Sequence, residues 1–293
     1  MQDPGESQAE SSGHFWMGCA VWAHAGWRGS FYPAGSRSAP LRLYAQRLTA
    51  VEGNSFFYAI PPADQLERWK EETPEGFRFC PKVPSIISRN DLGATVADVR
   101  GFVDALAPLH GRLGPCFLQL PPALGPEKRA ELEAFVDAWP HGEQRMTVEL
   151  RHRQWYTRDG AELLESMLGE RCIGRAVLDT RPVYGAGDDP QIDHPHRKPE
   201  IPAHYMDTGP EVVLRLICHP RQEATDPWFS DWAQRIHAYL DRGRDVYAFL
   251  HCPDEDRSPD YALQLQARLE ARGAPVPPLP EPSGDPDGQL ELF

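Results

Sequence analysis

The feature that most constrains the fold is a series of eight short strand-like runs, each rich in β-branched, aromatic or aliphatic residues. They start 27 to 39 residues apart and cover 17–22, 50–55, 77–83, 116–121, 146–151, 174–179, 212–217 and 245–251. This spacing leaves room for a strand, a helix and two loops in each repeat, and segments with helical periodicity lie between most of the runs. The pattern favours a closed parallel (β/α)8 barrel of the TIM type, with a doubly wound open sheet as the alternative.

The length of 293 residues fits one barrel domain with a tail at each end. We expect a disordered polar tail at 1–15, the barrel at 16–273 and a flexible, proline-rich acidic tail at 274–293. One interval, 181–211, is rich in proline and lacks helical periodicity. A connection of that length predicts a lid, a binding loop or a disordered segment.

Composition limits the classes of function. The net charge of -13, from 43 acidic and 30 basic residues, argues against a broad DNA-binding face but allows a small basic pocket. No apolar run approaches the ~20 residues that span a bilayer, and no signal peptide is recognisable, so we expect a soluble cytoplasmic protein. The six cysteines form no CxxC pair and each lies in or beside an apolar run, which predicts reduced, buried thiols.

Polar and aromatic residues gather where the predicted strands end, and in a parallel barrel those carboxyl ends meet at one rim. Candidate catalytic residues are Glu52, Lys82, Glu149, Asp179 and His251, and candidate substrate-binding residues are Trp27, Asn54, Tyr58, Gln119, Arg151, Trp155 and Arg215. The cations Lys82, Arg151 and Arg215 would hold an anion. The carboxylates would serve as general base or metal ligands and His251 as acid, and the aromatic rings would stack a base or ring.

A divalent metal is the open question about cofactors. Zinc or manganese ligands could come from Glu52, Glu149, Asp179, His219 and His251, with His24 as a further candidate. No HxH or HExxH spacing places two ligands together at the rim, which favours a histidine that acts as acid–base or hydrogen-bond donor over a bound metal.

The same residues carry a family resemblance. The segments GWRGSFYPAG, LRLYAQRLTAVEGNSFFYAIPP, ERWKEETPEGFRFCPKVPSIISR, GPCFLQLPPALGP, MTVELRHRQWY and GRDVYAFLHCPDEDRSPDYALQL resemble, in order, the domain-of-unknown-function 72 family, the YecE-like proteins. The resemblance covers about residues 17–270 and implies a TIM-barrel-like fold. The family's motif positions correspond here to Trp27, Glu52, Asn54, Tyr58, Lys82, Gln119, Pro121, Glu149, Arg151, Trp155 and Asp179. The resemblance implies no settled activity.

The C-terminal peptide has a separate interpretation. Gln289, Leu290, Glu291, Leu292 and Phe293 resemble the QLxLF peptide with which bacterial replication and repair proteins bind the sliding clamp. Such a peptide inserts apolar anchors into a pocket and needs a tether like residues 274–288. The alternatives are a frayed terminus, or Leu290, Leu292 and Phe293 folding back onto the barrel.

Together these patterns favour an enzyme that acts on a phosphate-containing or nucleic-acid-derived substrate at the carboxyl rim, by hydrolysis or phosphodiester cleavage. Recruitment to the sliding clamp would place that activity near replication or repair. Two other readings remain open. One is a non-catalytic adaptor that binds a ligand or partner. The other is a sugar-phosphate isomerase or aldolase that uses Lys82 as a base or as a Schiff-base amine.

Overall fold

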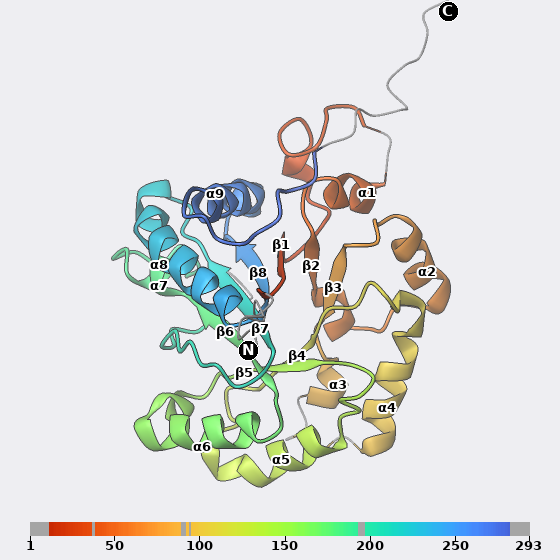
Figure 1. Cartoon of the computed structure of the whole chain (residues 1–293), viewed down its shortest axis with the longest axis vertical. Coiled ribbons are helices and arrows are strands. Elements are labelled where there is room, and N and C mark those ends of the chain that lie inside the picture. Colours follow the sequence, from red (N-terminus) through yellow and green to blue (C-terminus); the bar gives the residue numbers. More distant parts are fainter. Residues whose placement is uncertain (1–11, 37–38, 89–91, 94, 193–196, 282–293) are drawn as a thin grey trace, which may run out of the picture.

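Eight parallel strands form one sheet that curves into a barrel, which confirms the predicted TIM-type fold (Figure 1). The computed structural model describes residues 12–36, 39–88, 92–93, 95–192 and 197–281. The strands are β1 (Phe15–Cys19), β2 (Ala50–Gly53), β3 (Arg78–Pro81), β4 (Cys116–Gln119), β5 (Met146–Glu149), β6 (Gly174–Asp179), β7 (Glu211–Ile217) and β8 (Asp245–His251). Their order around the sheet is β3-β2-β1-β8-β7-β6-β5-β4.

The barrel closes between β3 and β4, where pairing is weaker than elsewhere. Only two isolated parallel bridges, Phe79 with Leu113 and Lys82 with Phe117, join this edge among the described residues. The Val83 N–H donates to the Phe117 carbonyl oxygen at 3.0 Å, just beyond the end of β3. The ring is therefore nearly closed, with its loosest seam beside Lys82.

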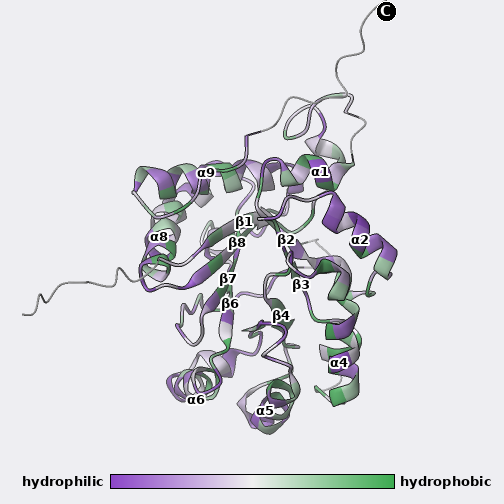
Figure 2. Ribbon diagram, turned by 45° about the vertical axis from the view of Figure 1, so that its right-hand side comes forward, coloured by the Kyte–Doolittle hydropathy of each residue, from purple (hydrophilic) through white to green (hydrophobic). Residues whose placement is uncertain are grey.

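Helices surround the strands, as Figures 1 and 2 show, and complete the alternation that the sequence predicts. They are α1 (Pro40–Ala45), α2 (Ala63–Glu71), α3 (Ser85–Ser88), α4 (Val96–Ala105), α5 (Arg129–Ala138), α6 (Arg158–Gly169), α7 (Arg181–Tyr184), α8 (Gln222–Asp241) and α9 (Ser258–Ala271). Thr95 and Asp98 form a capping box that starts α4. α8 contains Pro227 near its start, where the missing N–H of proline removes only one intrahelical hydrogen bond.

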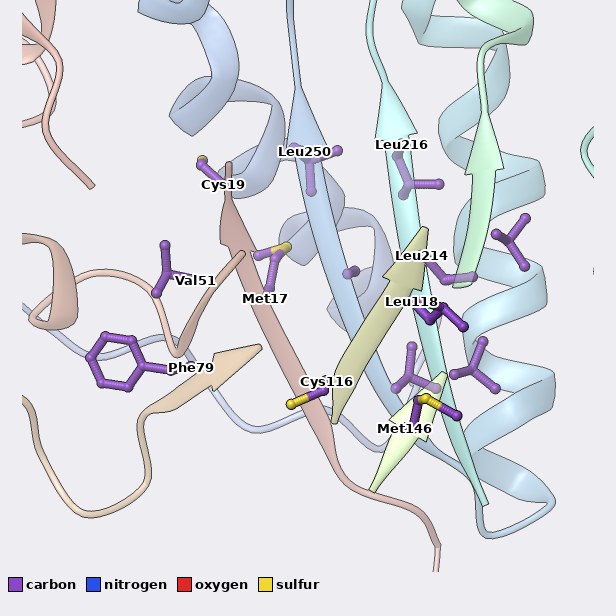
Figure 3. Packing of buried hydrophobic residues seen from close by; sticks show 14 of the residues in the cluster. Met17, Cys19, Val51, Phe79, Cys116, Leu118, Met146, Leu214, Leu216 and Leu250 are labelled. Carbon is purple, nitrogen blue, oxygen red and sulfur yellow. The ribbon is translucent and has the colours of Figure 1, made fainter. Parts of the chain in front are cut away.

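The two faces of the strands bury different groups. Inside the barrel, a small cluster contains Ala50, Cys80, Phe117, Ala176, Val213, Tyr247 and Phe249, with Trp16 against it. The residues between these positions face the helices and join a much larger outer cluster, part of which Figure 3 shows around Met17, Leu118, Leu214 and Leu250. This period of two decides which strand-end residues can meet inside the barrel.

Two strand glycines allow neighbouring strands to approach closely. A Cβ at Gly18 of β1 would lie 1.8 Å from the Ala50 carbonyl oxygen, and one at Gly174 of β6 would lie 1.8 Å from the Glu211 carbonyl oxygen. Any larger side chain would push these strands apart, so glycine is required at both places.

Both described chain ends lie against the barrel. The Gly13 N–H donates to the Leu240 carbonyl oxygen at 2.9 Å. In the segment expected to be a tail, Val276 and Leu279 pack on the outer cluster, and Gln266 donates to the Pro277 carbonyl oxygen at 2.8 Å. The chain as far as Leu279 therefore packs on the barrel, whereas the QLELF peptide at 289–293 lies outside the described residues.

Within the described ranges, no helix is both long and apolar enough to cross a membrane. All six cysteines are free, and five of them are buried. The sixth, Cys172, is exposed, so the prediction of buried thiols was wrong there. Cys172 lies in the turn after α6 with a positive φ of 52°, which places it outside the apolar strand that follows.

Candidate functional site

A cavity of about 390 Å³ opens above the inner cluster, at the carboxyl end of the barrel. Its lining side chains come from strand ends and rim loops: Ala20, Val21, Asn54, Phe57, Tyr58, Lys82, Gln119, Arg151, Arg197, Lys198, Arg215, His251 and Glu255. The polar floor follows from strand periodicity. Glu52 lies two residues after the inward-facing Ala50, and Lys82 two after Cys80. Gln119, Arg215 and His251 follow Phe117, Val213 and Phe249 in the same way. Each polar residue therefore continues the inward face of its strand.

Arg215 of β7 stands at the centre of this floor and pairs with two carboxylates. Its Nε and Nη2 donate to the two oxygens of Glu52, both at 2.8 Å, and its Nη1 donates to Glu149 Oε2 at 2.6 Å. Arg215 and both glutamates are almost completely buried. A bidentate pair with a further carboxylate satisfies most of the charge that burial would otherwise leave unpaired.

The network continues on both sides of Arg215. His251 Nε2 lies 2.9 Å from Glu52 Oε2. On the other side, Arg151 Nε donates to Glu149 Oε1 at 2.6 Å, and Arg151 Nη2 donates to Gln119 Oε1 at 2.7 Å. Gln119 Oε1 also accepts a hydrogen bond from Lys82 Nζ at 2.9 Å. One connected network thus joins polar groups from six of the eight strand ends.

The ion pairs keep the carboxylates ionised. Burial raises the pKa of Glu52, but Arg215 and His251 outweigh it and hold that pKa well below its ordinary value. Burial likewise raises the pKa of Glu149, yet Arg151 and Arg215 lower it to about 2. Burial lowers the pKa of His251, with partial compensation from Glu52. The floor therefore carries two fixed negative charges, matched by the two arginines.

Lys82 differs from the arginines because no carboxylate pairs with it directly among the described residues. Its Nζ bonds to the Gln119 amide oxygen and lies 3.9 Å from the centre of the Phe57 ring. Burial and the neighbouring Arg215 together lower the pKa of Lys82 to about 7, although Glu149 and Glu52 oppose the shift. A substantial share of the Lys82 amines is therefore neutral near pH 7.

Arg197 and Lys198 reach the cavity from the connection between β6 and β7, and the sequence analysis missed both. The connection covers the rim, where Ile201 packs with Leu178, Val183 and Ile217. A compositional signal was available, because only four of the 30 basic residues are lysines, namely Lys70, Lys82, Lys128 and Lys198. Two of these four line this one cavity.

Asp179 ends β6 but faces the helices, away from the other candidate catalytic residues. Ala176 points into the barrel, so Asp179, three residues later, points outward. Its carboxylate pairs with Arg181 at 2.6 Å and accepts hydrogen bonds from the Tyr205 hydroxyl at 2.7 Å and the Trp232 indole N–H at 2.8 Å. These bonds tie β6 to α8.

The predicted aromatic and amide residues fall into two groups. Trp27 and Trp155 are fully buried and donate their indole N–H to the carbonyl oxygens of Glu255 and Leu124, both at 2.8 Å, so they fix rim loops rather than line the cavity. Tyr58 lines the cavity and is 71% exposed. Asn54 also lines it and bonds to the Ala20 carbonyl oxygen at 3.2 Å.

The candidate metal ligands do not converge. Within the part of the chain that the structure describes, no three His, Cys, Asp or Glu side chains gather in a metal-binding arrangement. The oxygens of Glu52 and Glu149 are occupied by arginines and His251. His219 faces Asp188 at 3.3 Å outside the cavity lining, and His24 pairs with Asp256 at 2.9 Å. This donor set, already neutralised by cations, does not fit a divalent ion.

Comparison with known families places residues 16–285 in one described as "Protein of unknown function DUF72". The UPF0759 protein YecE of Escherichia coli (strain K12) is 33% identical over 276 residues, which cover 92% of this chain and 98% of that protein. The UPF0759 protein YunF of Bacillus subtilis (strain 168) is 30% identical over 173 residues, 56% of this chain and 60% of that protein.

Solved structures agree on the fold. A DUF72 family protein from Enterococcus faecalis V583 superposes with a TM-score of 0.69 at 18% identity, covering 92% of this chain and 99% of that one. A DUF72 family protein from Thermotoga maritima MSB8 gives a TM-score of 0.66 at 18% identity, covering 88% and 99%. At this identity the likeness concerns the barrel and not its chemistry.

Proposed function

This chain belongs to the DUF72 family, whose description records no function, and from the rim geometry we propose that it is an enzyme acting on a small phosphate-containing substrate. The observation that carries the proposal is the combination at one cavity of a buried lysine with a pKa lowered to about 7 and several further cations. Cations bind the anionic group, and the neutral amine of Lys82 performs the chemistry.

The spare hydrogen-bond donors of the cavity suit an anion. Arg151 uses its Nε and Nη2 in the network, and its remaining N–H groups have no hydrogen-bond partner among the residues that the structure describes. Lys82 uses one of its donors on Gln119. A phosphate group or a fragment of a nucleic acid brings the acceptor oxygens that these groups lack.

Two roles are open to the neutral amine of Lys82. As a base it takes a proton from the substrate and becomes an ammonium ion. As a nucleophile its nitrogen attacks a carbonyl carbon, a C–N bond forms, and the carbonyl oxygen leaves as water to give an imine. Both roles belong to the isomerase or aldolase class. That class is better supported than carboxylate- or metal-based hydrolysis, because the oxygens of Glu52 and Glu149 are occupied by cations.

Reaction with pyridoxal 5′-phosphate tests this proposal, since the reagent combines an aldehyde with a phosphate. Imine formation, reduction with borohydride and peptide mapping identify the lysine that reacts. We expect Lys82 to react faster than Lys70 and Lys128, with a rate that rises through pH 7. The variant Lys82→Arg keeps a positive charge and removes the fast reaction. Similar rates at all four lysines would contradict the proposal and favour a non-catalytic adaptor.

We also propose that residues 289–293 bind the bacterial sliding clamp, on the strength of the QLELF sequence alone. This function is independent of the cavity, since it needs only the two leucines, Phe293 and Gln289. The full-length chain is expected to bind purified sliding clamp in calorimetry, and the double variant Leu292→Ala/Phe293→Ala to lose that binding. Equal binding by both chains would refute the assignment.

A further inference from the structure

The wall of the cavity opposite Lys82 contains a second lysine that the proposed chemistry does not use. In the order of strands, β3 and β7 are four places apart, and so are β4 and β8, so each pair faces across the eight-stranded barrel. Lys82 follows β3 and bonds to Gln119 of β4. Lys198 instead lines a smaller cavity together with Ile217 and His251, the last residues of β7 and β8. The two lysines therefore reach the cavity from opposite sides of the barrel.

Two hydrogen bonds hold the backbone of Lys198, one at its N–H and one at its carbonyl oxygen. Its N–H donates to the side-chain oxygen of Gln191 at 3.0 Å, and its carbonyl oxygen accepts a hydrogen bond from the Tyr184 hydroxyl at 2.5 Å. Gln191 is itself buried. These anchors fix the backbone position from which the Lys198 side chain enters the cavity.

The Lys198 amine has no acidic partner among the described residues, because no carboxylate there lies within 4.0 Å of it. Burial and the positive charge of Arg215 lower the pKa of Lys198 to about 8, with Glu52 acting in the opposite direction. An anion bound beside this amine would supply the missing counter-charge and favour its protonated form.

We propose that Lys198 binds the anionic end of the substrate while the reacting carbonyl end lies at Lys82 across the cavity. Lys198 is then the specificity-determining residue of the site. This inference rests on the proposed function, which it narrows to a short compound with a phosphate at one end and a carbonyl group at the other.

The neighbouring cation Arg197 provides a matched control. It also lines the cavity, but its side chain is about half exposed and pairs with Asp189 at 2.5 Å. Its charge is therefore already balanced and screened by solvent. Removal of Arg197 should have little effect on an anion held by Lys198.

The experiment compares two reagents that differ only in a phosphate: pyridoxal 5′-phosphate and pyridoxal. Labelling rates at Lys82 are measured for the wild-type protein, Lys198→Ala, Lys198→Arg and Arg197→Ala. For each protein the rate with pyridoxal 5′-phosphate is divided by the rate with pyridoxal, and the ratio of each variant is compared with the wild-type ratio. We expect Lys198→Ala to lower this ratio roughly tenfold to a hundredfold, the range for a lost hydrogen bond between charged groups. Lys198→Arg should retain most of the wild-type ratio, and Arg197→Ala should change the ratio less than about threefold. The labelling rate with pyridoxal alone should stay the same in all three variants.

Each result decides one of the two proposals. An unchanged ratio in Lys198→Ala, or an adduct that forms on Lys198 in preference to Lys82, overturns the role of Lys198 while the proposed function of Lys82 can stand. If neither reagent labels Lys82, the proposed function fails. Calorimetric titration with inorganic phosphate then still tests Lys198: weakened binding in Lys198→Ala supports the anion site, and unchanged binding refutes it. Thermal unfolding of each variant checks that it is folded.

Discussion

The network around Arg215 and the group of hydrogen bonds around Asp179 contain the same kinds of residue but have different roles. Both contain a buried carboxylate at the carboxyl end of a strand, paired with an arginine at 2.6–2.8 Å. Glu52 continues the inward face of β2, so its network forms the floor of a cavity. Asp179 falls on the outward face of β6, so its bonds hold a helix. A strand-end carboxylate thus becomes a site candidate only on the inward face of its strand.

The largest expected effect comes from breaking the inner network at its centre. The variant Arg215→Met leaves Glu52 and Glu149 buried without their shared cation, and should lower the free energy of unfolding by about 3–5 kcal/mol. Urea unfolding at pH 7 measures this loss. A decrease of less than about 1 kcal/mol in the free energy of unfolding would mean that Arg215 does not balance the buried charges of the two glutamates.

A smaller effect on stability is expected from the hydrogen bonds around Asp179. Asp179→Asn keeps an oxygen that can accept from Tyr205 and Trp232 but removes the charge opposite Arg181, at a cost of about 2–3 kcal/mol. The labelling rate of Lys82 should stay within about twofold of the wild-type rate, since Asp179 faces away from the cavity. A large fall in labelling of the folded variant would contradict the separation of the two regions.

Removal of the Lys82 charge should stabilise the protein. The pKa of this lysine falls from ~10.4 in the unfolded chain to about 7 in the folded one, so burial of its charge costs most below pH 7 and the cost fades towards pH 10. We expect Lys82→Met to raise the free energy of unfolding by about 1–2 kcal/mol at pH 6 and by much less at pH 9. Denaturant unfolding at both pH values measures the difference. A larger gain in the free energy of unfolding at pH 9 than at pH 6 would contradict this expectation.

The smallest effect should occur at the edge of the cavity. Tyr58 is 71% exposed, so Tyr58→Ala should change the free energy of unfolding by no more than about 0.5 kcal/mol. If its ring contacts a bound ring, the variant should also slow labelling by pyridoxal 5′-phosphate, and a matched Trp27→Phe variant should not. The reverse pattern would show that the buried tryptophan, and not the exposed tyrosine, contacts the ligand.

Much of this organisation could be predicted from the sequence, because strand spacing determines a barrel and a barrel gathers its strand ends. Glu52, Lys82, Gln119, Glu149, Arg151, Arg215 and His251 do come together as expected. The direction in which Asp179 points depends on which residues of β6 face inward. The sequence does not show this, because the strand is buried on both faces. Lys198 escaped notice because its position depends on long-range contacts of an irregular connection, which have no periodicity to read.

The proposed chemistry depends on a Lys82 amine that is partly neutral at physiological pH, and an NMR titration of protein labelled at the lysine side chains measures that pKa. With four lysines in the chain, the variants Lys82→Arg and Lys198→Arg assign the two cavity signals. We expect the Lys82 signal to titrate with a pKa of about 7, and this pKa to rise when inorganic phosphate is added. A Lys82 pKa near the ordinary ~10.4 would refute a partly neutral amine at this site.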